Sequence, residues 1–336
     1  MIVLKTSREL SIMRKAGKIS QKALRLAGEA VEPGFPPGNR QDCPPVYRER
    51  GGNPQLLGYS GYPASACISV NNVVIHGIPS KSTILKHGDI VSVDVGAFYQ
   101  GFHGDNAWTF PCGQISEEAR ALLEATEKSL FLGIEQARPG NRIGDVGHAV
   151  QGYVEARGYS VVREFVGHGV GAKLHEDPSV PNYGTPGRGV RLMPGMVIAI
   201  EPMINVGKPG VKILDDGWTT VTQDGSLSAH FEHTVPSLPM GPCSSPLWTE
   251  ERPWSGNGAR LSRSACRHDQ GSFLTVLEAA PPYAVVADGK RRPLERPKRK
   301  KLFHLAPTSQ VLPEEALKTN RQIRAALRSF EQAAVK

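Results

Sequence analysis

The sequence predicts an α/β (α+β) protein with a large part made of two related halves, followed by a small, basic β domain. Three observations predict this class. Segments with helical spacing alternate with short β-branched runs, as in mixed α/β folds. One strand-and-carboxylate pattern occurs twice along the chain. The net positive charge is confined to the C-terminal part, and 336 residues allow one large and one small domain.

Three helices are expected in the larger part. The first begins near Thr6, because Thr6 and Glu9 have the spacing of a capping box, and it ends at a Pro-Gly pair. The second begins near Ser116 and also ends at a Pro-Gly pair. The third covers residues 143–157, and the glycine that follows is typical of a helix C-terminus.

The expected strands are β-branched runs at residues 90–95, 161–166, 196–200 and 218–221. Residues 85–94 align with residues 192–201 at an offset of 107 positions, and the copies end in Asp94 and Glu201. This pattern is weak alone, because a turn, a strand and an acid often occur together by chance. It nevertheless predicts two related halves that each deliver a carboxylate at the end of a strand.

Charge divides the chain into two parts. Residues 1–240 contain 23 Lys and Arg and 23 Asp and Glu, whereas residues 241–336 contain 17 and 9, so the second part carries the whole net charge of +8. No run of about 18 apolar residues could span a membrane, and the first residues lack the apolar core of a signal peptide. Five cysteines without a CxxC pair argue against a disulfide framework. We expect a cytoplasmic, monomeric protein that does not contact membranes.

Five side chains could bind metal ions: Asp94, Asp105, His168, Glu201 and Glu232. Four carboxylates and one imidazole suit two divalent ions such as Co²⁺, Mn²⁺, Fe²⁺ or Zn²⁺. Carboxylates placed close together raise one another's pKa, so four of them could not all ionise without a cation. Each acid taken alone is more often a solvated surface charge. Asp94 and Glu201, however, follow apolar strand cores, where an unpaired charge is costly.

A set of ordered motifs surrounds these residues. The motifs are GYSGYPASAC at 58–67, HGIP at 76–79, GHG at 167–169, IEP at 200–202 and FEHT at 231–234. With them, the chain resembles the type I methionine aminopeptidases, which have the pita-bread fold, over residues 1–34 and 56–235. The tyrosine-rich motif at 58–67 separates it from the proline dipeptidases that share this fold.

The resemblance implies a role for each candidate ligand. Asp94 would bind one ion, and Asp105 and Glu232 would bridge both ions. His168 and Glu201 would complete the coordination of the other ion. A water activated by the ions would attack the first peptide carbonyl, and Glu201 would accept its proton.

The resemblance also implies substrate-binding residues. His175 would donate to the carbonyl oxygen as it becomes an oxyanion, and His76 would place the substrate or shuttle a proton. For either histidine alone, a structural role is about as frequent as a catalytic one. The methionine side chain would lie among Tyr59, Tyr62, Cys67 and Trp218, unless these residues are ordinary core. Cys67 has no neighbouring histidine that would make it a nucleophile.

The expected activity is removal of the initiator methionine from nascent polypeptides whose second residue is small. The alternative is a non-catalytic pita-bread protein that acts as a ribosome- or RNA-binding factor. The intact set of ligand positions favours the enzyme, whereas the basic C-terminal part supports the alternative.

Residues 35–55 depart from the family pattern. They contain five prolines and no helical or strand periodicity, where the family has an amphipathic helix. Similarity is lost and regained abruptly at nearly preserved length, which fits either a compensated pair of frameshifts or genuine divergence. Loss of an outer helix would cost several kcal/mol, so we expect the chain to be less stable than other family members.

The expected domains are a catalytic domain over residues 1–235, a linker over 236–258, a basic domain over 259–308 and a C-terminal helix over 309–336. The linker is rich in Pro, Ser and Gly. It matches neither neighbouring family, so the joined domains are either a true gene fusion or two genes joined by a sequencing error.

The basic domain resembles KOW-type RNA-binding domains of ribosomal proteins, with strands expected at 272–278 and 283–287. The resemblance implies an SH3-like barrel that contacts ribosomal RNA or the ribosome surface. The alternative is a solvated basic loop. The expected phosphate-binding residues are Lys290, Arg291, Arg292, Arg296, Lys298, Arg299, Lys300 and Lys301.

Overall fold

The computed structural model describes residues 1–36, 47, 51–238, 259–264, 273–280, 283–288, 290–301, 305–312 and 317–333. These residues belong to two units, Met1–Pro239 and Met240–Lys336. Most of the expected linker and of the proline-rich segment 35–55 lies outside the described residues. None of the helices in the described ranges has the length and apolar character of a membrane span.

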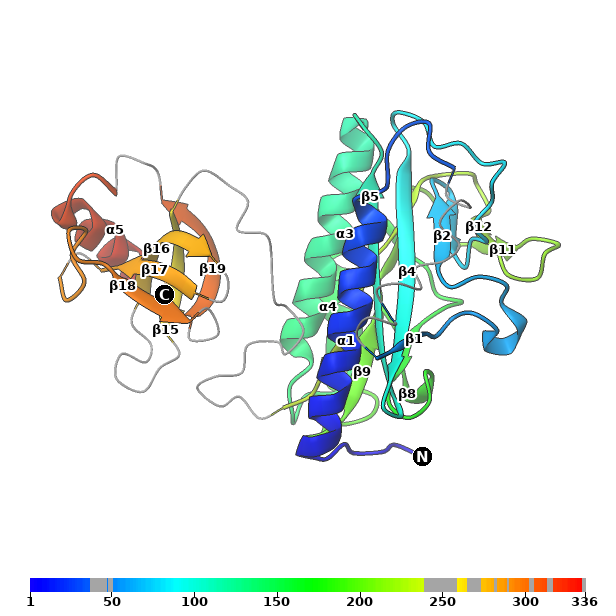
Figure 1. The fold of residues 1–336 in the computed structure, drawn as a ribbon, viewed down its shortest axis with the longest axis horizontal. Helices are drawn as coiled ribbons and strands as arrows, with labels where there is room; N and C mark the ends of the chain where they lie inside the picture. The colour runs from blue at the N-terminus through cyan, green and yellow to red at the C-terminus, as the bar shows by residue number, and fades with distance from the viewer. Residues whose placement is uncertain are drawn as a thin grey trace. The chain divides into compact units, whose positions relative to one another are not determined.

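The three expected helices of the N-terminal unit are present as α1 Ser7–Gly28, α3 Glu117–Gln136 and α4 Ile143–Glu155 (Figure 1). The capping box at the start of α1 is confirmed. The Glu9 backbone N–H donates to Thr6 Oγ1 at 3.3 Å, and the Glu9 carboxylate accepts from the Thr6 backbone N–H at 2.7 Å. α1 ends at Gly28, before the predicted Pro-Gly pair. Beyond it, the backbone N–H groups of Ala30 and Val31 donate to carbonyls three residues earlier, as in a 3₁₀ turn.

Removing the capping hydroxyl is expected to destabilise the N-terminal unit. In Thr6→Ala the Glu9 N–H loses its acceptor, which costs about 1 kcal/mol. The melting temperature should fall by roughly 2–4 °C for a domain of this size. Ser7→Ala, at the exposed first residue of the helix, is the matched control and should melt like the wild type. Equal melting temperatures for both variants would contradict the role of the cap.

An antiparallel eight-stranded sheet forms the centre of the N-terminal unit, in the order β1-β4-β5-β14-β9-β7-β8, with β2 also paired to β4. Its strands are β1 Asn53–Pro54, β2 Cys67–Val70, β4 Ile90–Tyr99, β5 Phe102–Pro111, β7 Gly167–Gly169, β8 Glu176–Val180, β9 Val197–Ile200 and β14 Glu232–Pro236. Helices α1, α3 and α4 lie on one side of this sheet (Figure 1). Polar side chains can therefore gather on the other side.

Two three-stranded sheets, β13-β10-β6 and β11-β12-β3, complete this unit. Their strands are β3 Val73–Ile75, β6 Ser160–Val161, β10 Met203–Asn205, β11 Val211–Ile213, β12 Thr220–Thr222 and β13 Ser228–His230. The strand predicted at 161–166 was too long, because its partner β10 has only three residues. The Val162 N–H still donates to the Met203 carbonyl at 3.0 Å, and beyond it Phe165 packs against a hydrophobic cluster. The strand predicted at 218–221 begins later, because the Asp216 carboxylate first accepts two backbone N–H groups at 2.8 Å in a turn.

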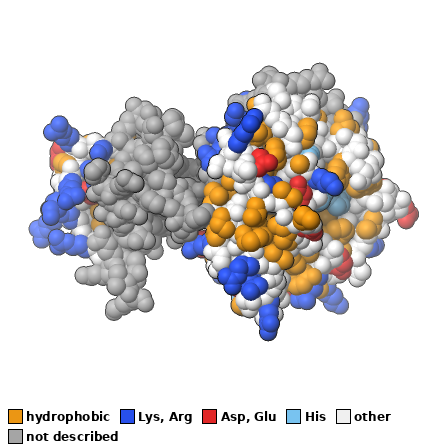
Figure 2. Space-filling model, turned by 90° about the horizontal axis from the view of Figure 1, so that it is seen from below, with side chains coloured by type: hydrophobic (Ala, Val, Ile, Leu, Met, Phe, Trp, Pro, Cys, Tyr) orange, Lys and Arg blue, Asp and Glu red, His pale blue; other side chains and the backbone are white. Residues whose placement is uncertain are grey.

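The C-terminal unit contains an antiparallel five-stranded sheet, in the order β18-β17-β16-β15-β19, and helix α5. The elements are β15 Ala259–Ser264, β16 Phe273–Ala280, β17 Tyr283–Ala287, β18 Lys298–Lys301, β19 Leu305–Leu312 and α5 Asn320–Ala333. Ile323 and Leu327 of α5 are buried in one hydrophobic cluster with Ala287 and Leu312. Figure 2 shows Lys and Arg side chains gathered on the described surface of this unit.

Candidate metal centre

The register of the central sheet places three carboxylates on one face. Asp94 of β4 and Glu232 of β14 both lie opposite Ala107 of β5, and Asp105 lies two residues before Ala107. Side chains two residues apart in a strand point to the same face. The alternate residues of β4, such as Val93, pack against α1 instead. The carboxylates therefore gather on the face that α1 does not cover.

Glu201 and His168 approach from the next strands of the same sheet. Glu201 directly follows β9, and His168 is the central residue of β7. His168 Nε2 lies 3.6 Å from Glu201 Oε1, and His230 Nε2 lies 3.5 Å from Glu201 Oε2. The Asn182 side-chain amide donates to the Glu201 carbonyl at 2.9 Å. These contacts hold Glu201 beside the three carboxylates of Asp94, Asp105 and Glu232.

The donor set fits a divalent cation. Ligand atoms of Asp105, His168 and Glu232, all buried, lie within 4.8 Å of one another. Asp94 Oδ1, Asp105 Oδ1 and Glu232 Oε1 are buried and have no hydrogen-bond partner in the described part of the chain. Buried acceptors of like charge are expensive unless a cation compensates them. The structure thus brings all five predicted ligand residues to one region, and possible ligand atoms of three of them lie within 4.8 Å of one another.

The electrostatics of the cluster point the same way. Burial raises the pKa of Asp94 to about 6. Burial and the neighbouring Asp94 and Glu201 charges raise the pKa of Asp105, and burial and the Asp105 charge raise that of Glu232. Burial also acts on Glu201, but the neighbouring His230 and His168 imidazoles outweigh it and lower its pKa. Glu201 is therefore the carboxylate of this group that ionises most readily.

His230 was not assigned a role from the sequence, although it contacts Glu201. It is 2% exposed and stands two residues before Glu232. In an extended chain that spacing puts two side chains on the same side, which was the available signal. Thr234 also supports the site, because its hydroxyl accepts from the Asp105 N–H and donates to the Asp105 carbonyl, both at 2.9 Å.

The two predicted substrate-binding histidines lie in different surroundings. The His175 ring centroid is 4.1 Å from that of His168, and His175 Nδ1 is 2.5 Å from the Tyr59 hydroxyl. Burial and the His168 charge lower the pKa of His175 to about 4. The His76 ring meets Trp218 edge-on at 6.1 Å, and burial lowers its pKa as well. Both imidazoles are therefore neutral near neutral pH.

Three of the four predicted pocket residues form one hydrophobic cluster. Tyr62 and Cys67 are buried in it, and Trp218 packs against it, with its ring 5.1 Å from that of Tyr62. Tyr59 instead contacts His175. The cluster also contains Leu174, which the sequence did not single out. Burial raises the pKa of the Cys67 thiol well above its usual value, so the thiol is neutral and unreactive.

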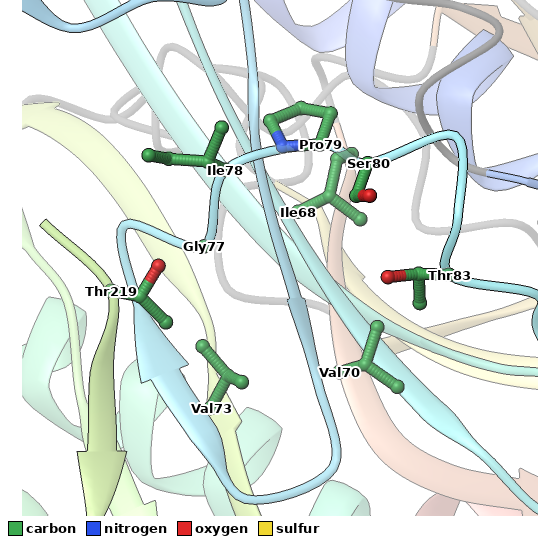
Figure 3. A pocket seen from close by; sticks show the side chains of 9 residues that line it. All are labelled: Ile68, Val70, Val73, Gly77, Ile78, Pro79, Ser80, Thr83 and Thr219. Atoms are coloured by element: carbon green, nitrogen blue, oxygen red, sulfur yellow. The ribbon is translucent and has the colours of Figure 1, made fainter. Parts of the chain in front are cut away.

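A separate cavity of about 190 Å³ lies beside β2 (Figure 3). Ile68 and Val70, which line it, alternate along β2 with Cys67, so the cavity lies on the other face of the strand. The remaining lining residues are Val73, Gly77, Ile78, Pro79, Ser80, Thr83 and Thr219. None of the nine is acidic, so this cavity is distinct from the candidate metal centre.

Comparisons with known proteins agree with this geometry. The sequence model of metallopeptidase family M24 matches residues 11–236. The methionine aminopeptidase of Clostridium perfringens is 56% identical over 243 residues, covering 72% of this chain and 97% of its own length. Methionine aminopeptidase 1 of Bacillus subtilis is 50% identical over 236 residues, covering 70% and 95%. The crystal structure of Thermotoga maritima methionine aminopeptidase superposes with a TM-score of 0.72 at 45% identity, covering 74% of this chain and 100% of that one.

Proposed function

The chain belongs to metallopeptidase family M24, and we propose that its N-terminal unit is a methionine aminopeptidase that removes the initiator methionine from nascent polypeptides with a small second residue. The observation that carries this proposal is the buried group of Asp105, His168 and Glu232 within 4.8 Å. It occurs in a unit that relatives named methionine aminopeptidase match at 50–56% identity. The alternative, a non-catalytic pita-bread protein, gives no reason for buried carboxylates without partners.

Five residues would hold the cofactor, two divalent ions of the Co²⁺, Mn²⁺, Fe²⁺ or Zn²⁺ class. They are Asp94, Asp105, His168, Glu201 and Glu232. When bound, such ions supply a water of lowered pKa as a nucleophile at neutral pH. The unpartnered oxygens of Asp94, Asp105 and Glu232 support this assignment.

Glu201 is suited to accept a proton, and His175 to donate a hydrogen bond. The lowered pKa of Glu201 keeps it ionised, and Asn182 and His230 orient it. If the Tyr59 hydroxyl donates to His175 Nδ1, the imidazole proton resides on Nε2 and is available to the substrate carbonyl oxygen. His76, beside Trp218, would place the substrate or shuttle a proton.

Release of methionine tests the proposal directly. Purified protein should release methionine from the peptide Met-Ala-Ser in the presence of added Co²⁺ or Mn²⁺. A peptide with a bulky second residue, such as Met-Leu-Ser, should be cleaved much more slowly. Absence of release at every metal concentration would overturn the enzyme assignment in favour of the non-catalytic alternative.

The pocket around Tyr62, Cys67 and Trp218 is proposed to hold the methionine side chain. Trp218→Ala is expected to raise KM for Met-Ala-Ser about tenfold with a smaller change in kcat, because the indole packs against Tyr62 and forms a wall of the pocket. Tyr153→Ala, on α4, is the matched control. An unchanged KM in Trp218→Ala would place the side chain of the substrate elsewhere.

For the C-terminal unit, we infer an SH3-like, KOW-type domain that binds ribosomal RNA or the ribosome surface. Its five-stranded antiparallel sheet and its excess of positive charge support this inference. Lys290, Arg291, Arg296 and Lys298 are exposed. Arg292 is partly buried and donates to Asp288 at 2.8 Å, so it is less available to phosphate. The side chains of Arg299, Lys300 and Lys301 lie outside the described residues.

Deletion of residues 241–336 tests this second assignment. The truncated protein should lose its affinity for RNA, and the full chain should bind RNA more weakly as the salt concentration rises. RNA affinity that survives the deletion would refute the role of the basic unit. Methionine release should be the same for both proteins.

A further inference from the structure

A buried ion pair joins the N-terminal segment to the loop that carries His175. The Lys5 ammonium donates to Glu176 Oε2 at 2.5 Å, and the two side chains are only 3% and 11% exposed. The ammonium also donates to the Val3 carbonyl at 2.9 Å. Burial acts to raise the pKa of Glu176, but hydrogen bonds from Lys5 and from the Lys173 backbone outweigh it and lower the pKa. Removing either partner of a buried ion pair leaves the other charge buried and uncompensated, which is strongly unfavourable.

The Glu176 carboxylate organises residues 170–176, which we call the His175 loop. Its Oε1 accepts from the Lys173 N–H at 3.1 Å. Gly171 lies so close that an added Cβ would be 2.3 Å from the same oxygen. The Gly171 carbonyl accepts from the His103 N–H of β5 at 2.9 Å. The loop therefore closes around a carboxylate that Lys5 neutralises.

Lys5 is itself fixed to the turn that precedes β9. Its backbone N–H donates to the Gly195 carbonyl at 2.7 Å. The next residue, Thr6, is the N-cap of α1, and α1 packs on β4 and β5. Those two strands carry Asp94 and Asp105. Lys5 thus connects the His175 loop to the strands that hold the metal-ligand carboxylates.

The loop delivers two side chains to the site. Leu174 is buried in the pocket cluster, and His175 contacts Tyr59 and His168. We propose that Lys5 is a positioning residue for methionine release: through Glu176 it holds the His175 loop so that His175 reaches the substrate carbonyl. This inference rests on the proposed function of the N-terminal unit.

A double-mutant cycle tests the inference. In Mn²⁺-loaded protein, Lys5→Met is expected to lower kcat/KM for Met-Ala-Ser about tenfold or more with unchanged bound metal, because a misplaced donor stabilises the transition state less well. In a His175→Ala background the same substitution should change kcat/KM less than about twofold, since residues that act through one another are not additive. Lys5→Arg keeps the charge and should retain most of the activity. Lys128→Met, exposed on α3, is the matched control.

The outcomes separate this inference from the proposed function. Full activity of Lys5→Met, or equal losses in both backgrounds, would overturn the inference and leave the enzyme assignment intact. If the wild type proves inactive, the ¹⁵N resonances of the His175 imidazole decide instead. They should shift in Lys5→Met and not in Lys128→Met, and unchanged resonances would overturn the inference. If Lys5→Met does not fold, the near-isosteric Glu176→Gln takes its place in the same cycle.

Discussion

Glu201→Gln is expected to lower kcat/KM for methionine release from Met-Ala-Ser by about 10³-fold, within the range typical of losing a general base. The substitution keeps the shape of the side chain but removes a group that can accept a proton. In the structure Glu201 faces His168 and His230 at 3.6 and 3.5 Å, and its lowered pKa keeps it ionised. The measurement is steady-state kinetics at saturating Co²⁺ or Mn²⁺.

Bound metal must be measured in the same samples, because Glu201 is proposed both to bind an ion and to accept a proton. A fully loaded but inactive Glu201→Gln protein would assign the loss to proton transfer. Glu135→Gln, exposed on α3, provides the matched control and should retain wild-type activity. More than a tenth of the wild-type activity in loaded Glu201→Gln would contradict the proton-acceptor role.

The helices were predictable from sequence because their ends are local features. Thr6 and Glu9 satisfy each other within one turn, and Ser116 accepts from the backbone N–H of Ala119 at 3.1 Å. The end of the strand predicted at 161–166, in contrast, is not fixed by residues close to it in the sequence. The length of the strand depends on β10, a partner of only three residues that lies far along the chain. Periodicity predicts which residues are buried and cannot tell how far a ladder extends.

The same distinction applies to the candidate site. Its proposed ligands stand in motifs that can be read from the chain, so all five could be named in advance. The side chains that orient them come from remote segments. His230 and Asn182 contact Glu201, and Lys5 reaches Glu176 across 171 positions. Apart from the two-residue spacing of His230 and Glu232, no short-range pattern marks such partners, because their contacts arise only when the central sheet is assembled.

In protein stripped of metal by a chelator, Asp94→Asn is expected to raise the free energy of unfolding by up to about 3 kcal/mol at about pH 8. Burial raises the pKa of Asp94 from 3.8 to about 6. The folded chain therefore binds this proton more tightly than the unfolded chain, and Asp94 costs stability as the pH rises through about 6. Asparagine does not titrate, so the advantage of the variant should vanish near the unperturbed pKa of 3.8. Denaturant unfolding at several pH values measures the difference.

Addition of the metal should reverse the order of the two proteins. A ligand that binds only the folded state adds about 4.1 kcal/mol at a concentration of 1,000 times its Kd, which exceeds the advantage of the variant. Asp94→Asn would gain less, because one proposed ligand is weakened. Asp145→Asn is the matched control. Asp145 accepts two backbone N–H groups at 2.6 Å, which lower its pKa, so this variant should lose stability at neutral pH with or without metal. Equal stabilisation of wild type and Asp94→Asn by metal would contradict the ligand role of Asp94. If Asp94 is a ligand, its ionised carboxylate destabilises the metal-free protein by burial and attracts the cation when the metal is present, so its removal must weaken the stabilisation by metal.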